Sequence, residues 1–93
     1  MVRIRIHPHA FDHGLTEEQI VSAYTTGADA VVVRRRDKDS EPTRRALIGF
    51  DNQMRAIQLL FVWDGADSIL IFHSQYLTKR FLAEVKEAYE QLR

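Results

Sequence analysis

Three of the four histidines in this chain lie within seven consecutive positions near its start, at His7, His9 and His13, with Asp12 among them. On a helix His9 and His13 share a face, and that spacing can bind zinc or nickel. No glutamate separates them, so the H-E-x-x-H pattern of metalloproteases is absent. The only other histidine, His73, is far along the chain. We therefore predict no metal site, and interpret His13 as a helix-end histidine in a position where positive charge is favourable.

The surroundings of His73 suit a different chemistry, the cleavage of RNA. One group must take the 2′-hydroxyl proton, another must protonate the leaving oxygen, and cations must hold the charge on the phosphorane. His73 and Tyr76 are the candidates for proton transfer. On an alternating strand His73 shares a face with Ile69 and Ile71 and emerges at the rim of the sheet. No Gly-x-Ser-x-Gly sequence or Gly-rich phosphate loop points to another chemistry.

Cations gather in the segment RRRDKDSEPTRR, residues 34–45, which has five arginines and one lysine against three acids. Guanidinium groups suit phosphates because each is a planar fork of donors that stays charged. The alternative is a solvated loop whose arginines are neutralised by the acids beside them. The last helix also opens with two cations, where its dipole disfavours them and where an anion would bind. The candidate phosphate-binding residues are Arg34, Arg36, Arg44, Arg55, Lys79 and Arg80.

The bulk properties indicate a single domain over residues 1–93, with enough hydrophobic residues (45%) for one core. No stretch is long and apolar enough for a membrane span, and the start lacks the apolar centre of a signal peptide, so we expect a cytoplasmic protein. The absence of cysteine excludes disulfides, thiolate zinc sites and a cysteine nucleophile. A net charge of zero argues against binding nucleic acid through bulk charge.

The predicted fold class is α+β. Alternation over 2–6 predicts a strand, and Pro8 and Gly14 bound a short helix at about 8–13. A second helix begins at the N-cap Thr16, with Gln19 as its capping-box partner, and ends at Gly27. Strands are predicted at 28–36, 44–51, 55–63 and 68–74, and an amphipathic helix from residue 78. We expect a four-stranded, mostly antiparallel meander plus the N-terminal strand, with the helices packed on one face.

Several segments together resemble the BrnT-like group of small bacterial toxins, within the RelE-type endoribonuclease superfamily. They are HGLTEEQI (13–20), RRALIGF (44–50), LLFVWDGADSILIFH (59–73) and TKR (78–80), with Tyr89 and Glu90 beyond them. The resemblance implies the RelE/BrnT-like fold and a metal-independent endoribonuclease that needs no cofactor. It also implies an mRNA substrate, free or on the ribosome, and a cognate antitoxin protein as partner, with no role for a membrane.

The resemblance places the active surface on a basic patch of the sheet, formed by Arg44 or Arg45, His73, Lys79 and Arg80. We take Arg45 as the third catalytic candidate, beside the histidine and Tyr76. Two departures favour an alternative function. The chain is neutral overall, and Gln75 stands where such toxins often have a basic residue. The alternative is a non-catalytic interaction module, a homodimer formed through an exposed strand edge or the terminal helix.

Overall fold

The computed structural model describes residues 2–27, 31–32 and 44–91. Two of the predicted phosphate-binding residues, Arg34 and Arg36, lie outside this range. The elements in chain order are β1 (Arg3–Ile6), the 3-10 helix η1 (Pro8–Phe11), α1 (Glu17–Thr26), β2 (Val31–Val32), β3 (Arg45–Phe50), β4 (Ala56–Trp63), β5 (Ser68–Tyr76) and α3 (Lys79–Gln91). The fold class is α+β, as predicted. No helix of the described residues is long and apolar enough to cross a membrane.

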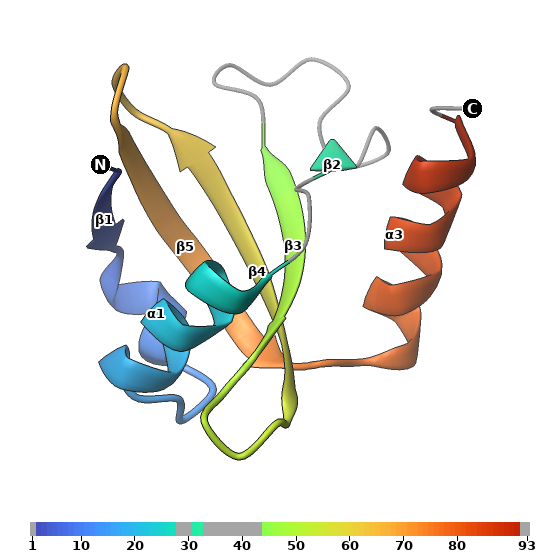
Figure 1. The fold of residues 1–93 in the computed structure, drawn as a ribbon, viewed down its shortest axis with the longest axis horizontal. Coiled ribbons are helices and arrows are strands. Elements are labelled where there is room, and N and C mark those ends of the chain that lie inside the picture. Colours follow the sequence, from blue (N-terminus) through green and yellow to red (C-terminus); the bar gives the residue numbers. More distant parts are fainter. Residues whose placement is uncertain (1, 28–30, 33–43, 92–93) are drawn as a thin grey trace.

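The strands form one five-stranded mixed sheet in the order β1-β5-β4-β3-β2 (Figure 1). Strands β2 to β5 follow one another as an antiparallel meander, in which short connections join β3 to β4 and β4 to β5. The first strand instead lies parallel to β5, at the edge of the sheet, and η1 and α1 separate it from the meander. The predicted meander with an added N-terminal strand is therefore confirmed.

The start of α1 is the local feature that the sequence predicts best. The Thr16 hydroxyl accepts the backbone N–H of Gln19, and the Gln19 side chain accepts the backbone N–H of Thr16, which completes the predicted capping box. Gly14 has a φ of +81°, in the left-handed region that glycine adopts without strain. The helix predicted at 8–13 is shorter than expected, a single 3-10 turn that ends before this glycine.

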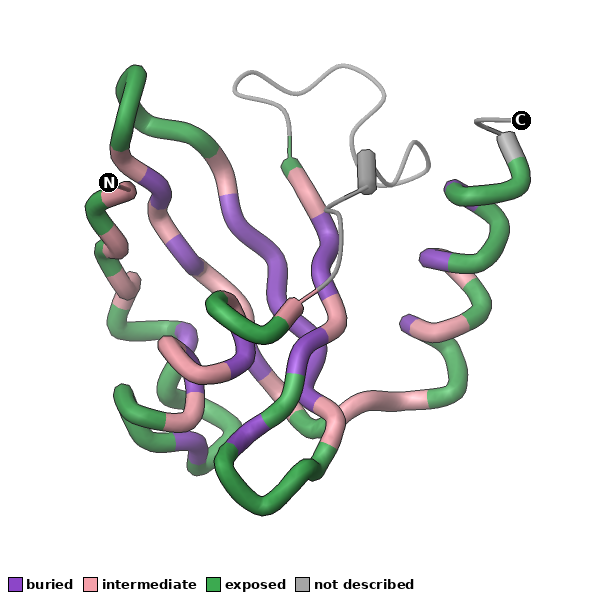
Figure 2. The backbone as a smooth tube through the Cα atoms, viewed as in Figure 1, coloured by how far each residue is buried: buried purple, intermediate pink, exposed green. Residues whose placement is uncertain are grey.

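The two α-helices pack on opposite faces of the sheet, which corrects the expectation that the helices share one face. Neighbouring residues in β3 and β4 belong alternately to two separate clusters, as side chains on a strand must. The cluster on the α1 face contains Ala10, Leu15, Ile20, Ala23, Leu47, Ile57, Leu59, Phe61, Ile69 and Ile71. The cluster on the α3 face contains Ala46, Leu60, Phe81, Val85 and Ala88. Figure 2 shows β4 buried along most of its length, as expected for a strand covered on both faces.

Helix α1 lies unusually close to β3. A Cβ atom added at Gly49 would lie 1.7 Å from the carbonyl oxygen of Ala23, so only glycine permits this approach. Nearby, the Ser22 hydroxyl donates to the carbonyl oxygen of Phe50, and the Thr26 hydroxyl accepts the N–H of the same residue. The helix is thus held to the sheet by backbone contact as well as by its apolar side chains.

Candidate functional site

The position of His73 is set by an irregularity in β5. The register pairs Leu60 with His73 and Phe61 with Ile71, so Phe72 is an extra residue in β5. A bulge of this kind breaks the alternation of side chains and turns the next residue to the other face. His73 therefore lies on the α3 face, and the expectation that it shares a face with Ile71 is wrong.

Because of the bulge, Ser74 and not His73 lies on the α1 face at this point of β5. It is fully buried, and its hydroxyl donates to the carbonyl oxygen of Ala10 at 2.6 Å. This bond fixes η1 on β5 just after the bulge. Without the bulge, the imidazole would occupy that closed position; with it, the imidazole is half-buried and open to the α3 face.

A side-chain amide connects His73 to the start of α3. Gln58 is buried (4% exposed), and its Oε1 accepts two hydrogen bonds from Thr78, from the backbone N–H at 2.9 Å and from the hydroxyl at 3.0 Å. The Thr78 hydroxyl in turn accepts the N–H of Phe81, as an N-cap residue does. Gln58 Nε2 lies 3.1 Å from His73 Nε2. We call His73, Gln58 and Thr78 the amide relay.

The relay assigns the tautomer of His73. A backbone N–H can only donate, so the Gln58 atom that contacts Thr78 is the carbonyl oxygen and the atom that faces His73 is the NH₂ group. His73 Nε2 must then be the acceptor, and the neutral ring carries its hydrogen on Nδ1. A proton on Nε2 would break this hydrogen bond, because two donors would face each other.

A second histidine contacts His73 from a distant part of the chain. The rings of His13 and His73 pack edge to face, with centroids 5.4 Å apart. The register of β1 along β5 ends at Ile6 and Ile71, and His13 reaches the next part of β5 from the segment that follows η1. The other two histidines, His7 and His9, stack on each other at 4.8 Å. No group of three or more residues among those described could hold a metal ion.

Three of the predicted cations lie on the same side of the sheet as His73 or at the start of α3. Arg44 is exposed, and its guanidinium lies 5.8 Å from the centre of the Phe72 ring, which packs against the α3-face cluster. Lys79 and Arg80 are exposed at the first two positions of α3, directly after the amide relay. Arg80 Nε lies 3.5 Å from Glu84 Oε1, where the arginine side chain is exposed and the glutamate side chain is largely buried.

The other predicted site residues lie on the α1 face. Arg45 pairs with Phe61, a member of the α1-face cluster, and its Nε is buried without a hydrogen-bond partner in the described part of the chain. Tyr76 pairs with Ile57, and its hydroxyl accepts a hydrogen bond from Gln19 Nε2 at 3.1 Å. The structure therefore separates these two residues from His73 by the thickness of the sheet.

Arg55 is held beside Tyr76 by an ion pair with Asp51. Its Nε donates to Asp51 Oδ2 at 2.8 Å, and its guanidinium lies 5.1 Å from the centre of the Tyr76 ring. Asp51 Oδ1 also accepts the backbone N–H groups of Gln53 and Arg55. Burial raises the pKa of the Asp51 carboxyl, but these hydrogen bonds and the Arg55 charge outweigh it and hold the pKa below its ordinary value of 3.8. These residues form a structural network.

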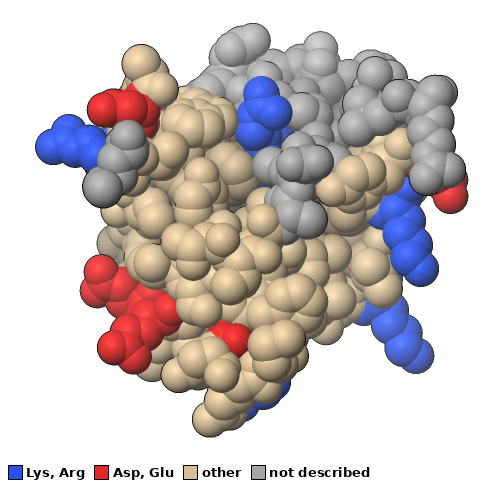
Figure 3. Space-filling view, viewed as in Figure 1, with Lys and Arg blue, Asp and Glu red and all other residues tan. Residues whose placement is uncertain are grey.

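The charged side chains do not form one continuous basic patch on the face that Figure 3 shows. Lysine and arginine side chains lie at separate places on it, and acidic side chains lie beside some of them and form a group at the left. On β1, Arg5 forms an ion pair with Asp64. Among the described cations of the α3 face, Lys79 and Arg80 lie together at the start of α3, whereas Arg44 directly precedes β3 and lies at the opposite end of the sheet (Figure 1).

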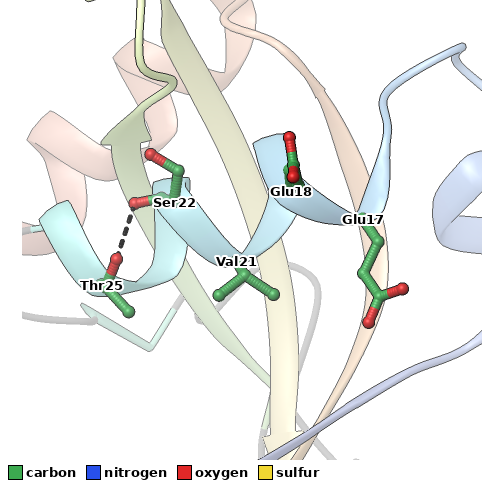
Figure 4. A pocket seen from close by; sticks show the side chains of 5 residues that line it. All are labelled: Glu17, Glu18, Val21, Ser22 and Thr25. Carbon is green, nitrogen blue, oxygen red and sulfur yellow. Dashed lines mark hydrogen bonds between the residues drawn. The ribbon is translucent and has the colours of Figure 1, made fainter.

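A cavity of about 450 Å³ lies along α1 and is separate from the amide relay. Its lining residues all come from that helix: Glu17, Glu18, Val21, Ser22 and Thr25 (Figure 4). The Thr25 hydroxyl donates to the carbonyl oxygen of Ser22, so it is used within the helix. Among the described residues, no histidine, lysine or arginine lines this cavity, and we assign it no role in the chemistry at His73.

The sequence analysis did not place two residues of the candidate site, Gln58 and His13. A glutamine within the apolar run AIQLLFVW was the available signal for the first, because a buried amide needs hydrogen-bond partners. His13 was interpreted as a helix-end residue, since nothing local shows its contact with a strand sixty residues later in the chain. Comparisons of the chain with protein-family models, curated proteins and solved structures find no match. The geometry of the site therefore carries the functional assignment.

Proposed function

We propose that the protein is a metal-independent endoribonuclease that cleaves mRNA at the α3 face, in the manner of the toxins of type II toxin–antitoxin pairs with a RelE/BrnT-like fold. The observation that carries this proposal is the bulge in β5, which turns His73 out of the core and toward the start of α3. Bulges are common next to active sites, where they redirect a side chain. Here the redirected side chain is an imidazole.

The amide relay supports the proposal because it holds an imidazole and the start of a helix in one fixed arrangement. The hydrogen bonds on both sides of Gln58 are 2.9 to 3.1 Å long. Catalytic groups must be held in this way, since small displacements cost large factors in rate. The first turn of α3 then adds two exposed cations directly after Thr78, and cations at a helix N-terminus suit a phosphate.

The proposed reaction needs only groups of this kind. The 2′ oxygen of a ribose attacks the adjacent phosphorus after an imidazole has taken its proton. The bond from phosphorus to the 5′ oxygen then breaks, and that oxygen takes a proton from water. Lys79 and Arg80 hold the phosphate and the charge that develops on it. The products are a 2′,3′-cyclic phosphate and a 5′-hydroxyl.

The proposal gives a smaller site than the sequence predicted. Three of the predicted site residues have structural roles on the α1 face instead. Arg45 packs beside Phe61, Tyr76 joins α1 to β5 through Gln19, and Arg55 lies over the Tyr76 ring. The partners of the proposed toxin are mRNA, free or on the ribosome, and a cognate antitoxin in the same cytoplasm. An antitoxin that covers the α3 face would exclude RNA from the relay.

The test is the digestion of a labelled RNA oligonucleotide by the purified protein in the presence of a chelator. We expect cleavage to products with a cyclic phosphate, and no cleavage of the same sequence made as 2′-deoxy. The double variant Lys79→Ala/Arg80→Ala should raise KM about tenfold, because phosphate contacts supply much of the affinity for nucleic acid. Lys86→Ala is the matched control, since it removes an exposed cation further along α3. Intact RNA with the wild-type protein would overturn the proposal and favour the interaction module.

A further inference from the structure

We infer that His13 is the proton-transfer residue of this site and that His73 is its positioning residue. The inference rests on the proposed function and reassigns the roles within it. The observation behind it is the edge-to-face contact of the two rings, 5.4 Å between centroids, which joins residues from opposite ends of the chain.

The ring of His73 has no nitrogen lone pair to offer a substrate. Its Nε2 accepts the NH₂ group of Gln58, whose orientation is fixed by the backbone N–H of Thr78. Its Nδ1 carries the hydrogen of the neutral ring. A general base needs an unshared pair on the nitrogen that takes the proton. While the amide relay is intact, His73 cannot act as that base.

His13 has the unshared pair on a ring nitrogen that a general base needs. Its side chain is exposed, and neither ring nitrogen hydrogen-bonds to any residue in the described part of the chain. The two other histidines of this segment differ, because His7 Nδ1 accepts the N–H of His9 and His9 Nδ1 contacts the Asp12 carboxylate. An imidazole whose ring nitrogen is not engaged in a hydrogen bond is the usual general base in proteins.

The fold holds the His13 ring in place without hydrogen bonds to its nitrogens. Gly14, with a φ of +81°, turns the chain directly after His13, and Leu15 is buried in the α1-face cluster immediately beyond. On the other side, the ring rests against His73, which the relay fixes. His13 is therefore positioned by its neighbours in the chain and by ring packing.

In the reaction, His13 takes the proton of the 2′-hydroxyl as the bond from the 2′ oxygen to phosphorus forms. The bond to the 5′ oxygen breaks, and this oxygen takes a proton from water. The hydroxide that remains takes the proton back from the His13 imidazolium. The proton balance then closes with water as the only co-reactant.

The experiment compares His13→Ala, His73→Ala and His9→Ala on the RNA oligonucleotide that the wild-type protein cleaves, with and without added imidazole. We expect His13→Ala to lose about a hundredfold in kcat, the usual contribution of a general base, and to recover activity with imidazole. His73→Ala should lose activity that imidazole does not restore, because the fixed support of His13 is gone. His9→Ala is the matched control and should cleave like the wild type.

The outcomes separate this inference from the proposed function. If the wild-type protein cleaves RNA and His13→Ala is equally active, the inference is overturned and the proposed nuclease function stands. Rescue of His73→Ala but not of His13→Ala would also overturn it, because the roles would be exchanged. An inactive His13→Ala that imidazole fails to restore, with an unchanged melting temperature, counts against it as well. An inactive wild-type protein is the failure of the proposed function itself.

Discussion

The two faces of the sheet differ in what they bury. On the α1 face, ten buried residues form a closed apolar cluster, and α1 touches β3 through backbone atoms at Gly49. On the α3 face the cluster has five buried residues, and a buried glutamine and a half-buried histidine lie beside it. Burying an amide is favourable only when its hydrogen bonds are made. Among the described residues, the α1 face therefore buries more apolar side chains, and the α3 face holds a glutamine, a histidine and a helix start joined by hydrogen bonds.

Of the substitutions that test this difference between the faces, Gly49→Ala should change the free energy of unfolding most. Its Cβ would lie 1.7 Å from the Ala23 carbonyl oxygen, and backbone cannot yield as a side-chain end can, so α1 must move off the sheet. We expect a loss of about 3 kcal/mol in the free energy of unfolding, measured by urea denaturation. Gly65→Ala is the control, because its Cβ would meet only the Ser68 Cβ, at 3.7 Å. Equal stability of the two variants would show that α1 is not seated as described.

A smaller effect on stability, with a larger one on cleavage, should follow from Gln58→Leu. The substitution removes the acceptor of the Thr78 N–H and the donor to His73, and it leaves a buried N–H without a partner. We expect a loss of about 2 kcal/mol in the free energy of unfolding and at least a tenfold loss in kcat. Gln75→Leu is the matched control, since Gln75 pairs with Gln58 across the sheet. If Gln58→Leu has the same free energy of unfolding and the same kcat as this control, the amide relay has neither of the roles described.

The smallest expected effect is a change in the acid stability of the α1 side. The folded pKa of Asp51 is lower than its unfolded value, so its stabilising contribution is present above about pH 4 and is lost as the pH falls through the folded pKa. Asp51→Asn should therefore lower the melting temperature at pH 7 and flatten the decline in stability on acidification. Thermal melts between pH 2 and 7 measure this, and parallel curves for the two proteins would contradict the network around Arg55.

Sequence patterns predicted the elements well where the signal is local. The capping box at Thr16 and Gln19 depends on four neighbouring residues, and the hairpin of β4 and β5 depends on a turn between two apolar runs. The helices were placed on one face because nothing local distinguishes the two sides of strands that are apolar on both. The alternation of Leu59 and Leu60 between two clusters shows the true arrangement only in three dimensions.

The candidate site was predicted less well, because one inserted residue decides it. The extra residue Phe72 shifts the face of His73, and no sequence rule for alternation contains this bulge. His73 and Tyr76, three residues apart, were predicted to act together and lie on opposite faces instead. His13 was named for its place near a helix end, and its contact with His73 depends on the path of the whole N-terminal segment.

The central claim is that the chemistry belongs to the α3 face alone, and two substitutions in β5 test it directly. His73→Ala and Tyr76→Phe each remove one polar group from the same strand, on opposite faces. In the chelator-containing RNA digestion, we predict that His73→Ala loses at least tenfold in kcat while Tyr76→Phe cleaves like the wild type. Loss of cleavage in Tyr76→Phe with full activity in His73→Ala would contradict the account.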